Sequence, residues 1–158
     1  MSKIDEMSAA FKPKVAAVLA DVRSKGAKIA IEPIYGGRRT PEQQRKIVGA
    51  GHSKTLKSYH LTGDAADLYE YTDDEFTGRR RFAWPSSRTQ FLIGSSALGR
   101  GIGWGGNFFK FDLLGIKRRR VKNAIIRLRE LGWPETHELY STEAGWDTCH
   151  IQLKANFV

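Results

Sequence analysis

The chain has little cysteine and no long apolar run. Its single cysteine, Cys149, excludes an internal disulfide and a cysteine-based metal cluster, which agrees with folding in a reducing compartment. No segment approaches the roughly 18 consecutive apolar residues that a membrane-spanning helix needs. The first ten residues include Asp5 and Glu6 and have none of the apolar core of a secretory signal peptide. We therefore expect a protein that is made in the cytoplasm and is not exported by an ordinary signal.

Acidic residues are also scarce relative to basic ones. The chain has 17 Asp and Glu against 26 Lys and Arg, a formal net charge of +9. This balance attracts polyanions such as nucleic acid, anionic membrane surfaces or bacterial wall polymers, but it specifies no chemistry. Hydrophobic residues still make up 41% of the 158 residues, enough for a packed core. A chain of this length fits one domain, and we expect residues 1–158 to form it.

Apolar periodicity and turn residues predict a mixture of helices and short strands. We expect helices at 8–25, 41–48, 86–98 and 116–131, strands at 28–34, 64–71 and 148–153, and a tight turn or short strand at 99–106. A charged loop should follow the strand at 64–71, include residues 79–81 and end near Pro85. Thr40-Pro41-Glu42-Gln43 has the pattern of a capping box with proline at the first helical position. Helices mixed with locally connected strands predict an α+β fold.

Two of the histidines lie near carboxylates. The chain has four histidines: His52, His60, His137 and His150. Taken singly, each is more often a surface or core residue than a ligand, but His60 precedes Asp64 and Asp67, and His150 follows Asp147. Two histidines and one carboxylate, with one position left open, form a typical catalytic zinc site, which also needs a separate carboxylate as general base. Spacing alone does not choose between Asp64 and Asp67.

The segment around His150 also constrains its neighbours. Residues three apart on a strand face opposite sides, so we expect Asp147 on the loop that leads into the strand, from where it can turn back over a metal. Cys149 adjoins His150, which suggests a cysteine–histidine nucleophile. Adjacent strand residues point to opposite faces, however, and we therefore expect Cys149 to be a buried structural thiol.

Of the four tryptophans, Trp104 and Trp146 are candidates for lining a cleft.

Four segments resemble those of one enzyme family. Ser58-Tyr59-His60-Leu61-Thr62-Gly63-Asp64-Ala65-Ala66-Asp67 fits the pattern S-x-H-x-x-G-x-A-x-D, and Asp147-Thr148-Cys149-His150 fits D-x-x-H. Both are similar to the D-alanyl-D-alanine carboxypeptidase and L-alanyl-D-glutamate endopeptidase family of zinc peptidases, which includes many phage endolysins. Arg39-Thr40-Pro41-Glu42-Gln43-Gln44 resembles the family's R-T-x-x-x-Q segment, and Gly103-Trp104-Gly105-Gly106 its W-G-G segment. The four segments occur in the family's order.

The resemblance implies roles for individual residues. His60, Asp67 and His150 match the three Zn²⁺ ligands, Asp147 the general base, and Arg39 the residue that stabilises the substrate oxygen as it becomes an oxyanion. The implied fold is a small, mostly antiparallel sheet with flanking helices and the zinc site at the sheet, as in D-Ala-D-Ala peptidases and hedgehog domains. The implied activity is hydrolysis of peptidoglycan stem peptides, with L-alanyl-D-glutamate cleavage favoured and D-Ala-D-Ala carboxypeptidase activity as the alternative.

The remaining expectations concern partners. The basic face of the predicted helix at 116–131 is either an ordinary solvated face or attracts anionic wall or outer-membrane polymers. A metal-dependent nuclease would explain the charge but not the ordered segments, and Asp147 argues against a binding module without catalysis. We therefore expect a monomeric, phage-type endolysin that binds peptidoglycan and no nucleic acid. It would be made in the host cytoplasm and act on the wall after release.

Overall fold

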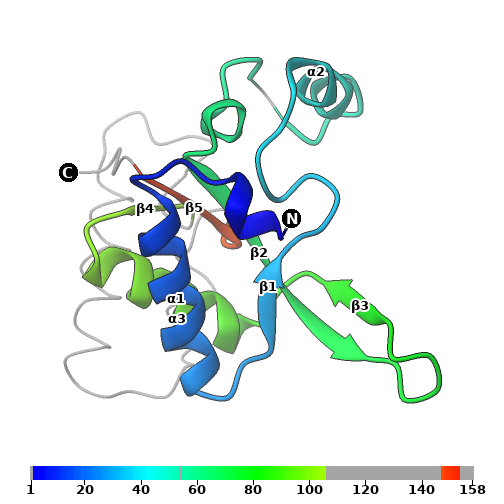
Figure 1. Cartoon of the computed structure of the whole chain (residues 1–158), viewed down its shortest axis with the longest axis vertical. Helices are drawn as coiled ribbons and strands as arrows, with labels where there is room; N and C mark the ends of the chain where they lie inside the picture. The colour runs from blue at the N-terminus through cyan, green and yellow to red at the C-terminus, as the bar shows by residue number, and fades with distance from the viewer. Residues whose placement is uncertain (1, 54, 106–146, 154–158) are drawn as a thin grey trace.

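The computed structural model describes residues 2–53, 55–105 and 147–153 (Figure 1). These residues form a small α+β fold with three α-helices and a five-stranded antiparallel sheet, which confirms the predicted class. No helix among them is both long and apolar enough to cross a membrane. The predicted basic helix at 116–131 lies outside the described residues, and the assignment of the whole chain to one domain stays a prediction.

The elements follow the predicted order along the chain. The α-helices are α1 (Lys12–Ser24), α2 (Pro41–Gly49) and α3 (Ser87–Gly99), and the short 3-10 helices are η1 (Lys3–Glu6) and η2 (Tyr59–Thr62). The strands are β1 (Ile29–Ile31), β2 (Ala65–Asp73), β3 (Arg80–Ala83), β4 (Gly103–Trp104) and β5 (His150–Gln152).

Local sequence determines where the helices begin. The first helix starts at Lys12 and not at Ser8, because the Ser8 hydroxyl accepts a hydrogen bond from the Phe11 amide in the preceding turn. Pro13 then fits the first helical turn, where its missing N–H is not needed. At α2 the expected capping box forms: the Thr40 hydroxyl accepts from the Gln43 amide, and the Gln43 side chain accepts from the Thr40 amide.

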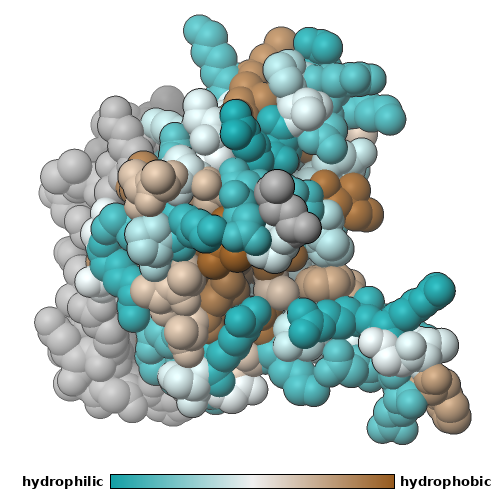
Figure 2. All heavy atoms as spheres, in the orientation of Figure 1, coloured by the Kyte–Doolittle hydropathy of each residue, from teal (hydrophilic) through white to brown (hydrophobic). Residues whose placement is uncertain are grey.

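The second strand is the centre of the sheet. The strand order is β1-β2-β5-β4, and β3 pairs with the far end of β2. The prediction of a charged loop through residues 79–81 is wrong in part, since Arg80 and Arg81 belong to β3. The Arg80 guanidinium lies 4.1 Å from the centre of the Tyr71 ring, a cation–π contact that favours the strand pairing. The resulting hairpin projects from the molecule, and its surface is mostly hydrophilic (Figures 1 and 2).

The two faces of the sheet have different roles. Side chains alternate along β2, so Ala66 and Leu68 are buried in the core with residues of α1 and α3, whereas Asp67 and Tyr69 line a cleft on the other face. Trp104, expected as a candidate for lining the cleft, is instead fully buried and donates a hydrogen bond to the Thr148 carbonyl at 2.8 Å. The sheet thus separates a helix-covered core from the face that holds the candidate site.

Candidate metal centre

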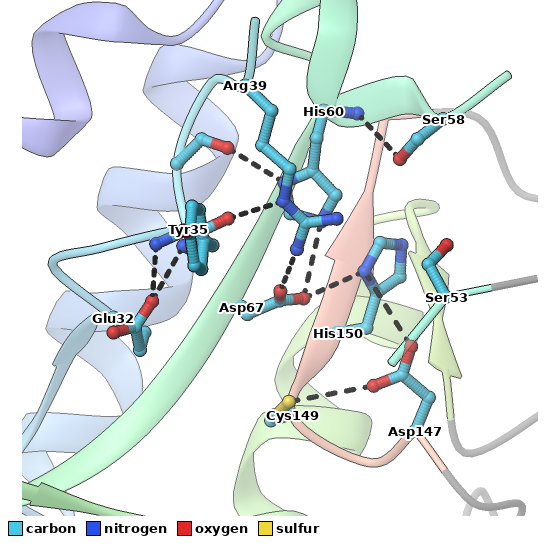
Figure 3. Close-up of polar contacts among 12 residues, drawn as sticks. Glu32, Tyr35, Arg39, Ser53, Ser58, His60, Asp67, Asp147, Cys149 and His150 are labelled. Carbon is cyan, nitrogen blue, oxygen red and sulfur yellow. Dashed lines mark hydrogen bonds and ion pairs between the residues drawn. The ribbon is translucent and has the colours of Figure 1, made fainter. Parts of the chain in front are cut away.

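The described residues form a cleft of about 1020 Å³ that contains all five predicted site residues. One side is α2 with the loop that follows it, and the floor is the open face of the sheet. The polar residues at its base come from separate parts of the chain (Figure 3). Asp64, the alternative ligand, does not line the cleft, because its carboxylate accepts hydrogen bonds from Ser8 and Thr62. His52 lines the outer cleft, and His137 lies outside the described residues.

His60 is held with one ring nitrogen free to act as a ligand. It lies in η2 and is only 1% exposed. Its Nδ1 lies 2.8 Å from the Gly37 carbonyl oxygen, which can only accept, so Nδ1 carries the proton. The lone pair is therefore on Nε2, a buried atom with no hydrogen-bond partner among the described residues. A buried polar atom without a partner is costly, and a bound cation would satisfy this one.

Asp67 and His150 meet because of strand register. They are direct cross-strand partners between β2 and β5 and lie on the same face. The Asp67 Oδ1 atom lies 2.9 Å from His150 Nδ1 and 3.4 Å from His60 Nε2. On the far side of the His150 ring, Nε2 lies 3.1 Å from the Gln152 Oε1 oxygen. Gln152 Oε1 and the Asp67 carboxylate both act as acceptors, so each ring nitrogen of His150 can donate. Nδ1 is the nitrogen that faces the other two groups, and a bound metal ion would replace its proton.

These residues could hold a metal ion. The candidate ligand atoms of His60, Asp67 and His150 all lie within 4.8 Å of one another, and the His60 nitrogen is otherwise unsatisfied. A second group, Asp67, Asp147 and Cys149, meets the same distance limit. Burial raises the pKa of the Cys149 thiol well above its usual value, and the charges of Asp67 and Asp147 raise it further. Among the described residues, only the group with two histidines contains a buried nitrogen that lacks a hydrogen-bond partner, so this group fits a metal better.

Arg39 binds the Asp67 carboxylate through the oxygen that does not contact the histidines. Its Nη2 donates to Asp67 Oδ2 at 2.7 Å, its Nη1 to Gln44 Oε1 at 3.1 Å, and its Nε to the Tyr35 carbonyl at 2.6 Å. This arrangement engages Oδ2 and turns Oδ1 towards the histidines (Figure 3). Burial raises the pKa of Asp67, but the neighbouring His60 and His150 outweigh it and lower the pKa below its usual value. Asp67 is therefore ionised, as a ligand must be.

A loop anchored by Glu32 shapes this part of the site. Its carboxylate accepts hydrogen bonds from three backbone amides, those of Ile34, Tyr35 and Gly36. The chain then turns so that the Gly36 carbonyl accepts from the Asp67 amide at 2.9 Å and the Gly37 carbonyl faces His60. A Cβ at Gly36 would lie 2.6 Å from the Glu32 Cβ, so the turn needs glycine. Sequence reasoning missed Glu32 and Gln152, and only the two glycines signalled a turn here.

Asp147 lies in the turn before β5, as expected. Its Oδ2 is 4.0 Å from His150 Nδ1, and its Oδ1 accepts a hydrogen bond from the Cys149 thiol at 3.6 Å. Burial raises the pKa of Asp147; His150 opposes this rise, and the charge of Asp67 adds to it. Cys149 is buried as predicted, although its thiol contacts Asp147 and is not isolated in the core. A carboxylate with a raised pKa beside a candidate metal centre is suited to proton transfer.

Comparison with known proteins shows the fold. No protein-family model matches this chain, and no curated protein sequence matches it. Among solved structures, the crystal structure of the L-Ala D-Glu endopeptidase ChiX from Serratia marcescens is similar, with a TM-score of 0.52 and 20% sequence identity. The match covers 96% of this chain and 84% of ChiX. At this identity the two proteins share a fold, and the roles of the site residues stay predictions.

Proposed function

We propose that this chain is a zinc-dependent peptidase that hydrolyses stem peptides of bacterial peptidoglycan, with the L-alanyl-D-glutamate bond as its target. The observation that carries the proposal is the buried group of His60, Asp67 and His150, with Asp147 beside it in a cleft. The fold shared with an L-Ala D-Glu endopeptidase supports it, and so do the four ordered segments of the sequence. Two histidines, one carboxylate and a separate base are the parts that zinc peptidases use.

The residues of the site would divide the work. His60 would bind zinc through Nε2, His150 through Nδ1 and Asp67 through its carboxylate. The bound ion would supply Lewis-acid polarisation of the peptide carbonyl and lower the pKa of water. Asp147 would take the proton from the attacking water and pass it to the leaving amine.

Arg39 has donors to spare for a substrate. Within the described residues, each of its two terminal nitrogens makes one hydrogen bond, which leaves one further N–H on each. We propose that one of these N–H groups stabilises the developing oxyanion. The ion pair with Asp67, at 2.7 Å, would fix the guanidinium in place before the substrate binds.

The test is hydrolysis of purified peptidoglycan, with mass spectrometry of the released fragments. The proposal predicts new L-alanine carboxyl termini and D-glutamyl amino termini, loss of activity with a chelator and recovery with zinc. Release of D-alanine alone would indicate the carboxypeptidase alternative. No cleavage by zinc-loaded protein, with nicking of plasmid DNA in a parallel assay, would refute the proposal in favour of a nuclease. An endolysin role further predicts lysis only when the protein reaches the wall.

A further inference from the structure

The cleft has two chemically different sides. On one side, α2 and the following loop contribute Lys46 and Lys57. On the sheet side lie Tyr69 of β2 and Trp84, which follows β3. The candidate metal centre lies at the base, so a bound chain would contact both sides.

The three acidic residues that line the described part of the cleft all have polar partners there. Glu32 is held by backbone amides, with Oε2 2.7 Å from the Tyr35 nitrogen. Asp67 is paired with Arg39 at 2.7 Å. Asp147 accepts from Cys149 and lies 4.0 Å from His150. Within the described residues, none of the three forms an ion pair with Lys46 or Lys57.

Lys46 and Lys57 are both exposed, and neither forms an ion pair within the part of the chain that the structure describes. Hydrophilic residues cover much of the surface over α2 (Figure 2). Within the described part of the cleft, the side formed by α2 and the following loop therefore presents two positive charges without an acidic partner. Walls of low dielectric strengthen the attraction of such a cleft for an anion.

Part of the sheet side is aromatic. Trp84 is 46% exposed and packs edge-on against Tyr69, with ring centroids 5.7 Å apart. These rings can support a small or apolar part of a ligand, but they cannot recognise its charge.

We infer that the cleft selects peptides that carry a free carboxylate, and that Lys46 and Lys57 recognise that carboxylate. The inference rests on the proposed function and specifies its substrate class. A D-glutamyl residue linked through its side chain leaves its α-carboxylate free, whereas the amidated form has a neutral carboxamide there. The enzyme should therefore prefer stem peptides with the free acid.

The test uses two synthetic stem peptides that differ only in this group, one with the carboxylate and one with the carboxamide. Affinity is measured by calorimetry on the zinc-loaded full chain carrying Asp147→Asn, and hydrolysis is measured separately with native Asp147. We expect the peptide with the carboxylate to bind more tightly than the peptide with the carboxamide. Lys46→Gln and Lys57→Gln should each reduce this preference by about fivefold, because an exposed ion pair contributes about that factor to an affinity. Lys46→Arg should keep the preference.

Arg45→Gln is the matched control, since Arg45 is an exposed cation on the same helix that does not line the cleft. It should leave the preference unchanged, and circular dichroism would check that every variant is folded. Equal binding of acid and amide by the parent protein, or an unchanged preference in the Lys46→Gln, Lys57→Gln double variant, would overturn the inference. Selective binding of the acid without hydrolysis would support it and count against the proposed peptidase activity instead.

Discussion

Gln152 is expected to set the affinity of the site for zinc although it is not a ligand itself. It lies two residues after His150 on the same face of β5, is 2% exposed, and places its side-chain oxygen 3.1 Å from His150 Nε2. In Gln152→Leu, a change of similar volume, this acceptor is lost. The imidazole can then move its proton to Nδ1, the nitrogen that must be unprotonated to bind metal.

The size of the effect follows from two costs. A buried donor left without its acceptor costs about 1–3 kcal/mol. Loss of a hydrogen-bond partner behind a metal-bound histidine typically weakens metal binding by about 10- to 100-fold, or roughly 1.4–2.8 kcal/mol. The two ranges agree, so we expect the zinc dissociation constant of Gln152→Leu to rise by about 10- to 100-fold.

Competition with a chromogenic chelator measures this constant without relying on activity. Gln152→Glu is the matched control, because it keeps an oxygen acceptor at the same place and should bind zinc within about threefold of the parent. Thermal unfolding in the presence of chelator would show whether the metal-free fold is intact. A folded Gln152→Leu protein with the parent affinity would refute the reasoning, as would equal losses in the Leu and Glu variants.

Four further outcomes are expected. His60→Ala should abolish stoichiometric zinc binding, measured by atomic absorption after dialysis, because it removes the otherwise unsatisfied Nε2. Asp147→Asn should keep zinc while turnover falls by roughly 10²-fold or more, and loss of zinc would make Asp147 a ligand. Gly105→Ala should lower the unfolding midpoint, since a Cβ there would lie 1.9 Å from the Asp147 carbonyl oxygen; an unchanged midpoint would contradict the packing. Charge reversal to glutamate at residues 118–120 should slow lysis of intact walls most at low salt and spare cleavage of a soluble peptide, whereas equal losses on both substrates would contradict a role in wall attraction.

Local sequence determined most of the secondary structure. The apolar stripe of α1 and the capping box at Thr40 depend on interactions within a few residues, so spacing alone predicts them. The loop prediction at residues 79–81 was wrong because the structure there depends on a distant strand. Three consecutive arginines have no strand signal of their own, and Arg80 and Arg81 become part of β3 only because β2 is available to pair with them.

In the candidate site, too, the sequence predicted which residues take part, whereas their arrangement depends on the tertiary structure. The sequence pattern singled out His60, Asp67, His150 and Asp147, because motifs preserve residue types and spacing. The arrangement of their atoms depends on contacts distant in sequence. Asp67 faces His150 through the register of β2 on β5, 83 residues apart in the chain, and no local rule determines that register.

Only the tertiary structure decided which nitrogen of each histidine is available. The Gly37 carbonyl holds His60 Nδ1, and Gln152 holds His150 Nε2, so the two rings offer different nitrogens to the same centre. The sequence likewise marked Arg39 as functional but could not show that it first engages Asp67. Residue type determines which groups can bind a metal or move a proton. The direction in which each group points depends on the loop at Glu32 and the pairing of strands, which form only when the whole sheet is assembled.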